Sequence, residues 1–164
     1  MLPPAHTPRK AIDMRLLPRT AVLAQGVCVV ALAGMAYCHI KDVGMKFDEH
    51  VYYMATLFCC NIVASLLLIP AVVAFGRRGD RRARAVWAAA GSLALLTIAG
   101  FLWSRTIGFP QMKDHVGEWD ALGLASLAFE AVIVLVSVTQ LRAARAESTQ
   151  MTLTDARATV GMLR

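Results

Sequence analysis

The chain has 164 residues, of which 57% are hydrophobic and 17% are charged. Soluble domains average about 45–50% apolar residues even when glycine is counted, and the mean hydropathy here is +0.55. These values exclude an ordinary soluble domain and indicate a membrane protein. The formal net charge of +6 would raise the question of nucleic-acid binding in a soluble chain, so its meaning depends on where the charges lie.

Four segments are long enough and apolar enough to cross a bilayer. A hydrocarbon core of about 30 Å needs about 20 apolar residues in a helix. Residues 20–38, 51–75 and 85–104 contain no Asp, Glu, Lys or Arg, and residues 121–141 contain one, Glu130. Apolar residues occupy all faces of each segment, as is typical of membrane spans. The sequence therefore predicts an all-α, integral membrane, up-down-up-down four-helix bundle.

Basic residues collect in alternate segments of the chain. The segment before the first span, the connection between the second and third spans, and the tail carry 13 Lys and Arg against 4 Asp and Glu, a net charge of +9. The first and third connections carry 4 bases and 6 acids, a net charge of −2. Because Lys and Arg are enriched in cytoplasmic loops, both termini are predicted to be cytoplasmic. Membrane topology accounts for the basic charge, so we expect no nucleic-acid partner.

These boundaries divide the chain into three regions. Residues 1–19 are predicted to form a basic cytoplasmic arm, residues 20–141 the transmembrane bundle, and residues 142–164 a cytoplasmic tail that we expect to be mobile. A signal peptide cleaved near residues 33–36 is an alternative for the start of the chain. Its apolar run of 19 residues is longer than the usual run of about 7–15.

Glu130 is the one acidic or basic residue within the predicted spans. It lies about ten residues, or about 15 Å, into the fourth span, and Asn61 lies at a similar depth in the second. Ionisable groups at such depths usually face the interior of the bundle. We predict an intramembrane polar layer of Glu130, Asn61, Gln25 and Thr97. Glu130 is either a proton- or ion-responsive group, or it fixes helix packing through a hydrogen bond to Asn61 or a hydroxyl.

Histidines and carboxylates gather in the first and third connections. His39 ends the first span, His50 precedes the second, and His115 lies in the third connection. Three imidazoles with carboxylates can hold zinc, and imidazole with methionine suits copper. Solvated acidic loops would explain the same residues. No cofactor is predicted, and a metal ion at His39, His50 and His115 on the outer face is kept as an alternative.

The third connection has the residues of an ordered loop. Gly108 and Pro110 suit a turn, and Trp119 suits the membrane interface. Arg105 can extend outward to an acidic partner. The candidate partners are Asp114, Glu118 and Asp120.

Residues 104–135 also contain a longer pattern, S-R-T-x-G-[LF]-P, then G-x-W, then L-G-x-x-S-L-x-x-E. The pattern resembles that of a group of uncharacterised actinobacterial four-helix integral membrane proteins. The resemblance implies a small bundle with an ordered outer loop, in which Arg105, Gly108, Pro110 and Trp119 have structural roles. We accordingly expect a multi-pass protein of the bacterial cytoplasmic (plasma) membrane. The resemblance implies no reaction.

Three functions remain open. The small size, and the lack of a nucleophile–base set or a nucleotide motif, favour a non-enzymatic accessory subunit or structural component of a membrane complex. Its partners would be the lipid bilayer and other membrane subunits or a second copy of the chain. The alternative is a proton- or ion-coupled transporter or channel component that uses Glu130. A second alternative is a metal- or redox-active membrane protein that uses the outer histidines.

Overall fold

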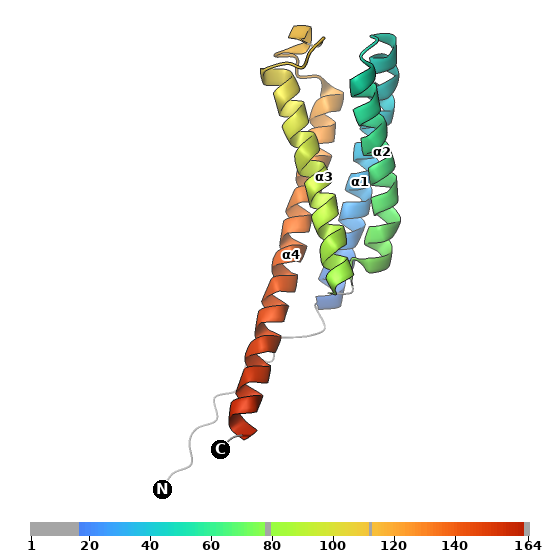
Figure 1. Cartoon of the computed structure of the whole chain (residues 1–164). Coiled ribbons are helices and arrows are strands. Elements are labelled where there is room, and N and C mark those ends of the chain that lie inside the picture. Colours follow the sequence, from blue (N-terminus) through green and yellow to red (C-terminus); the bar gives the residue numbers. More distant parts are fainter. Residues whose placement is uncertain (1–16, 78–79, 112, 163–164) are drawn as a thin grey trace.

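The computed structural model describes residues 17–77, 80–111 and 113–162, and this part of the chain is all-helical. Residues 1–16 of the predicted basic arm lie outside the described residues. Each long helix is apolar and long enough to cross a membrane, which confirms the four predicted spans at that level. The helices are α1 (Leu17–Asp48), α2 (Tyr52–Phe75), α3 (Arg81–Thr106) and α4 (Ala121–Met162), with a short 3₁₀ turn, η1 (Lys113–His115), before α4 (Figure 1).

Two helices continue well past the predicted spans. α1 runs ten residues beyond Cys38, so the first connection shrinks to residues 49–51. α4 continues to Met162, through residues assigned to the tail. A fall in hydropathy marks where a helix leaves the hydrocarbon, and it does not mark where the helix ends. At 1.5 Å per residue, α1 extends about 15 Å beyond its predicted span. Residues 39–48, which were predicted to form a loop, are therefore the last three turns of α1.

Local hydrogen bonds fix the ends of α3. Asp80 precedes the helix, and its side chain accepts a hydrogen bond of 2.8 Å from the backbone N–H of Ala83, which is the usual N-cap arrangement. The indole N–H of Trp87 donates to the carbonyl of Gly76 at 3.0 Å and so ties the start of α3 to the end of α2. At the other end, Gly108 has φ of +83°, a left-handed conformation that favours glycine after a helix.

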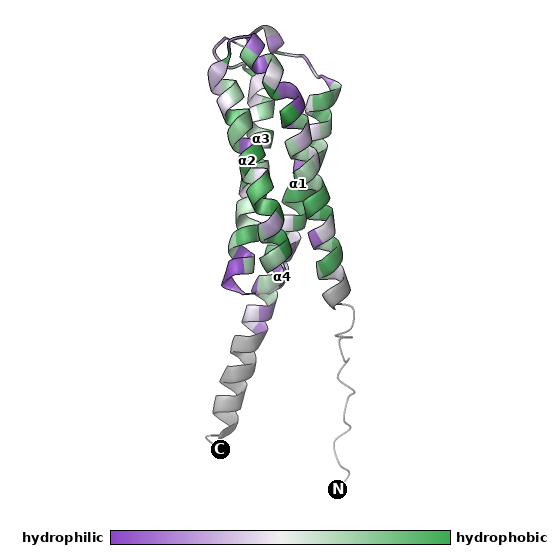
Figure 2. Ribbon diagram, turned by 90° about the vertical axis from the view of Figure 1, so that its right-hand side faces the viewer, coloured by the Kyte–Doolittle hydropathy of each residue, from purple (hydrophilic) through white to green (hydrophobic). Residues whose placement is uncertain are grey.

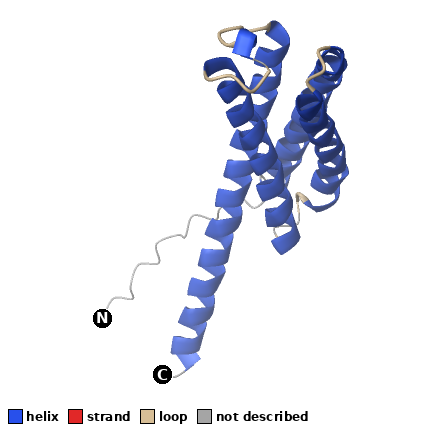
Figure 3. Ribbon diagram, turned by 45° about the horizontal axis from the view of Figure 1, so that its top comes forward, coloured by secondary structure: helices blue, strands red, loops and turns tan. Residues whose placement is uncertain are grey.

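The helices pack side by side, α1 against α2 and α4, and α3 against α4 and less closely against α2. The connections 49–51 and 107–120 meet at one end of the bundle, which we call the loop end, where the Tyr53 hydroxyl donates to the carbonyl of Pro110. Toward the loop end the α1/α2 pair and the α3/α4 pair diverge (Figures 1 and 3). The main core lies between the four helices and includes Leu32, Met35, Val72, Trp87 and Ile133.

Apolar residues predominate along the middle of the helices, and polar residues are concentrated toward the ends of the bundle (Figure 2). Several leucines, one from each helix, are at least 65% exposed: Leu23, Leu67, Leu96 and Leu135. Continuous apolar surface of this kind is unfavourable in water and is suited to contact with lipid chains. The four helices thus indicate a multi-pass membrane protein.

Helices α3 and α4 approach closely at Gly91, where a Cβ atom would lie 2.9 Å from Cβ of Ser137. Gly91→Ala should therefore push the two helices apart and lower stability by about 1–3 kcal/mol, measured as a lower melting temperature in detergent. Gly26→Ala is the matched control, because a Cβ there meets nothing within 4 Å and alanine is the better helix former. Equal melting temperatures for the two variants would contradict the close contact.

Candidate functional site

A pocket of about 390 Å³ lies between the four helices, in the half of the bundle next to the loop end. It is lined by residues within 38–46 of α1, 54–64 of α2, 93–105 of α3 and 120–130 at and after the start of α4. Each helix contributes two to three turns, so the pocket extends for roughly 15 Å along the bundle. Its volume falls in the range typical of small-molecule sites, about 300–1,000 Å³.

The wall of the pocket is mainly apolar, with polar groups at its two ends. Near the loop end it is lined by Asp42, Lys46, Arg105 and Asp120. The deep end is lined by Asn61, Thr97, Ser126 and Glu130. The wall also includes apolar and aromatic side chains, among them Met54, Phe58, Leu93, Phe101 and Phe109. This combination of an apolar wall and a few polar groups is typical of ligand sites.

Glu130 is fully buried at the deep end, with 0% of its surface exposed. Its Oε1 accepts a hydrogen bond of 2.8 Å from the hydroxyl of Ser126, one turn earlier on the same helix. Its Oε2 has no hydrogen-bond partner among the described residues. A buried polar atom without a partner costs about 1–3 kcal/mol. The described residues therefore leave one hydrogen-bonding position of Glu130 without a partner.

Part of the predicted polar layer is present around Glu130. The Nδ2 of Asn61 donates to the Thr97 hydroxyl at 2.8 Å, which links α2 to α3. Both residues line the pocket together with Glu130. No hydrogen bond joins Glu130 to Asn61 among the described residues, and the hydroxyl that bonds to Glu130 is that of Ser126, on the same helix and not across the bundle.

Gln25 does not belong to this layer. Its Nε2 donates to the carbonyls of Val72 and Val73, at 2.5 and 2.8 Å. Val72 follows Asn61 by eleven residues in the sequence, or about 16 Å along α2. The sequence prediction measured the depth of Gln25 in the membrane from Cys38, taken as the end of the first helix. Because α1 continues past Cys38, that reference point misplaces the side chains of α1 relative to those of α2. Gln25 instead bonds two helices together at the end opposite the loop end.

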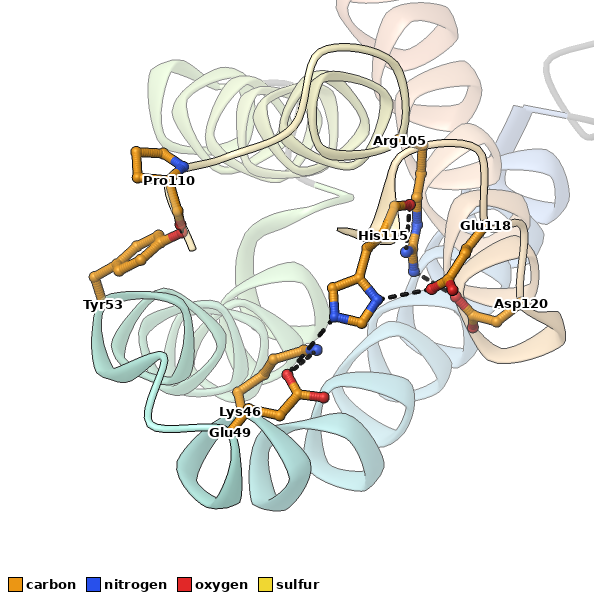
Figure 4. Close-up of polar contacts among 8 residues, drawn as sticks. All are labelled: Lys46, Glu49, Tyr53, Arg105, Pro110, His115, Glu118 and Asp120. Carbon is orange, nitrogen blue, oxygen red and sulfur yellow. Dashed lines mark hydrogen bonds and ion pairs between the residues drawn. The ribbon is translucent and has the colours of Figure 1, made fainter. Parts of the chain in front are cut away.

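Arg105 has the acidic partner that the sequence predicted. Its Nη2 lies 2.5 Å from Oδ2 of Asp120, and its Nη1 donates to the carbonyl of His115 at 3.4 Å (Figure 4). The guanidinium also lies over the ring of Phe101, with 5.3 Å from Cζ to the ring centre. Its Nε is buried and has no hydrogen-bond partner in the described part of the chain. The side chain of Asp114, another candidate, lies outside the described residues.

The third connection is also tied to the first. The Nδ1 of His115 donates to Glu118 at 2.7 Å, and its Nε2 lies 4.0 Å from the carboxylate of Glu49. That same carboxylate pairs with Lys46 at 2.7 Å. Figure 4 shows these groups together with the contact between Tyr53 and Pro110. The contact between Glu49 and His115 therefore links the two connections, and the Tyr53 hydroxyl links α2 to the third connection.

The loop residues named from the sequence take ordered positions. Gly108 turns the chain after α3, and the carbonyl of Pro110 accepts the hydrogen bond from α2. Trp119 packs edge to face on Phe101, with ring centres 5.9 Å apart. Gly117, which the sequence marks only as the glycine of the G-x-W pattern, has a φ of +84° and forms a second turn. Its backbone N–H donates to the Arg105 carbonyl at 2.9 Å.

The three histidines named as metal ligands have separate surroundings. His39 is buried, with its ring centre 4.9 Å from that of Phe58, and its Nδ1 donates to a backbone carbonyl one turn earlier on α1. His50 lies against the ring of Tyr52, and His115 bonds to carboxylates. The described residues contain no group of three or more His, Cys, Asp and Glu side chains placed to hold a metal ion.

Asp42 and Lys46 also line the pocket. The sequence indicates Asp42 only as one of the carboxylates of the first connection, and it does not single out Lys46. A continuous α1 places them one turn apart on the same face, at i and i+4. This i, i+4 spacing in the sequence could have predicted that Asp42 and Lys46 share a helix face. The prediction requires that residues 39–48 be helical. Asp42 has no ion-pair partner within 4.0 Å among the described residues.

Replacing Arg105 by alanine should release the third connection from α4. Because the pair lies at the surface, with Asp120 half-exposed, we expect a loss of about 1 kcal/mol, seen as a lower melting temperature in detergent. Lys113→Ala is the control, since Lys113 is an exposed base of the same loop. An unchanged melting temperature for Arg105→Ala would argue against a stabilising role of the pair.

Comparison of the chain with models of protein families, with curated proteins and with solved structures finds no match. The resemblance of residues 104–135 to actinobacterial membrane proteins therefore stays an expectation.

Proposed function

We propose that this chain is a multi-pass membrane protein that binds a cation at Glu130 in exchange for a proton, as a component of a transporter or channel. The observation that carries the proposal is a fully buried carboxyl group with one unpaired oxygen at the deep end of a pocket of about 390 Å³. A lone carboxylate is very costly in apolar surroundings. Glu130 therefore keeps a proton until a cation takes the proton's place.

The charges around the pocket also favour a cation. Its lining includes three acids, Asp42, Asp120 and Glu130, and two bases, Lys46 and Arg105. Each base is already paired with a carboxylate, Lys46 with Glu49 and Arg105 with Asp120. The carboxyl groups left for a ligand are those of Asp42 near the loop end and Glu130 at the deep end. An incoming cation would meet one and then the other.

We further infer an up-down-up-down order of spans with both termini in the cytoplasm, so that the loop end and its pocket face outward. The net charges of +9 and −2 in alternate segments support this orientation. The resemblance of residues 104–135 supports a bacterial plasma membrane.

Carbodiimide labelling tests the proposed role of Glu130. Dicyclohexylcarbodiimide is neutral and lipophilic, and a neutral carboxylic acid adds across one of its C=N bonds to give an O-acylisourea. In the absence of a nucleophile, the acyl group then moves from oxygen to nitrogen and leaves a stable N-acylurea. In protein held in nanodiscs, peptide mass spectrometry should find the adduct on Glu130. Sodium, potassium, choline and tetraphenylphosphonium chlorides are then tested for protection, and a bound cation should also release about one proton per site into weakly buffered solution.

Matched variants make the result specific. Glu130→Gln should show neither the adduct nor proton release, whereas Glu147→Gln, a change of an exposed acid, should behave like the parent chain. If Glu130 is unlabelled and no cation releases a proton, the proposal is wrong. The accessory role favoured by the sequence would then be the better explanation.

Cysteine labelling tests the orientation. In a chain whose four cysteines are replaced by serine, Asp48→Cys and Lys113→Cys should react with a membrane-impermeant maleimide added to intact cells. Arg77→Cys should react only after the membrane is permeabilised. The reverse pattern would place the loop end in the cytoplasm.

A further inference from the structure

We propose that the cation is a lipophilic organic monocation, and that it enters the pocket sideways from the bilayer between α2 and α3. This inference rests on the proposed exchange at Glu130 and names the substrate class of that site. It follows from the size of the pocket, the chemistry of its wall and the position of its opening.

The size and the wall of the pocket suit an organic cation. A volume of about 390 Å³ holds a drug-sized molecule and far exceeds a bare metal ion. A hard metal ion also needs about six oxygen ligands, whereas three phenylalanines, Phe58, Phe101 and Phe109, line this pocket. Aromatic faces attract organic cations, and the apolar wall removes their hydrocarbon surface from water and lipid headgroups.

Helices α2 and α3 are tied to each other at two points. Tyr53 of α2 bonds to Pro110, just after α3 (Figure 4), and Asn61 of α2 bonds to Thr97 of α3. Even so, α2 and α3 are the neighbouring helices that pack least closely. Leu57 and Leu96 line the pocket from these two helices and are 54% and 72% exposed on the bundle surface. The wall of the pocket thus continues to the lipid-facing surface there.

Lateral entry selects for a ligand that already resides in the membrane. Leu57 and Leu96 lie within the apolar segments of α2 and α3, so the opening faces hydrocarbon in a bilayer. A strongly hydrated cation does not enter hydrocarbon at acceptable cost. A cation whose charge is covered by apolar groups does, and it reaches Glu130 without crossing the ion pairs of the loop end.

Glu130 is the group on which the exchange depends. The other ionisable side chains of the lining are Cys38, His39, Asp42 and Lys46 on α1, Cys60 on α2, Arg105 on α3, and Asp120 before α4. The two bases among them have carboxylate partners, and Asp42 is only half-buried near the loop end. In the exchange, the Glu130 O–H bond breaks, the proton leaves to water, and the carboxylate pairs with the cation. Charge in the pocket is therefore conserved.

Binding of tritiated tetraphenylphosphonium to the full chain in zwitterionic nanodiscs tests the inference. We expect saturable binding at one site per chain above the level of empty nanodiscs, with release of about one proton. Glu130→Gln should weaken binding at least tenfold. Neutral triphenylphosphine oxide, a probe of similar shape without the charge, should compete poorly.

A second variant separates the shape of the pocket from its charge. Gly100 lines the pocket, and a Cβ there meets nothing within 4 Å, so Gly100→Leu should fill the space and keep Glu130. It should bind tetraphenylphosphonium at least tenfold more weakly. Gly26→Leu, at another open glycine outside the lining, should bind like the parent chain. Melting temperature and size-exclusion profile confirm that each variant is folded.

The outcomes are distinguishable. Absence of saturable binding, or equal binding by Glu130→Gln and the parent chain, overturns the lipophilic cation. If carbodiimide still labels Glu130 and sodium or potassium releases its proton, the proposed cation exchange stands and only this inference fails. If Glu130 is unlabelled and no cation releases a proton, both fail. Equal binding by Gly100→Leu and the parent chain would overturn the location of the site in this pocket.

Discussion

A carboxyl group surrounded by hydrocarbon needs a hydrogen-bond partner, a proton or a cation, because the unpaired charge is too costly in a medium of low polarity. In this bundle the Ser126 hydroxyl bonds to one oxygen of Glu130, and the other oxygen has no hydrogen-bond partner among the described residues. Glu130 lies in the wall of the pocket at its deep end. Four helices packed closely along their whole length would bury Glu130 in a closed core, where only a proton could reach it.

The pocket exists because the bundle is tight at one end and open at the other. Away from the loop end, Gln25 bonds α1 to α2, and Trp87 bonds α3 to the end of α2. A glycine at position 91 lets α3 approach α4. Toward the loop end the two helix pairs separate, and the Tyr53–Pro110 hydrogen bond and the Glu49–His115 contact span the gap. Contacts at both ends of the bundle therefore flank the pocket.

Hydropathy and charge predict the spans of this chain well, because both follow directly from the bilayer. They also place Glu130 and Asn61 in the interior and Arg105 beside an acid. The extent of α1 is not predicted, because nothing in the composition of residues 39–48 distinguishes a helix in the headgroup region from a loop. Asp42 and Lys46 are missed for that reason. Gln25 is misplaced because relative depth depends on how helices pack, which no single segment encodes.

Arg105 belongs to both the pocket and the closure of the loop end. The same side chain lines the cavity and pairs with Asp120, and its Nε has no hydrogen-bond partner among the described residues. Because Asp120 offsets the charge of this guanidinium, loss of the pair would leave an uncompensated positive charge in the wall of the cavity. A cation bound in the cavity and an intact Arg105–Asp120 pair would therefore stabilise each other by the same factor.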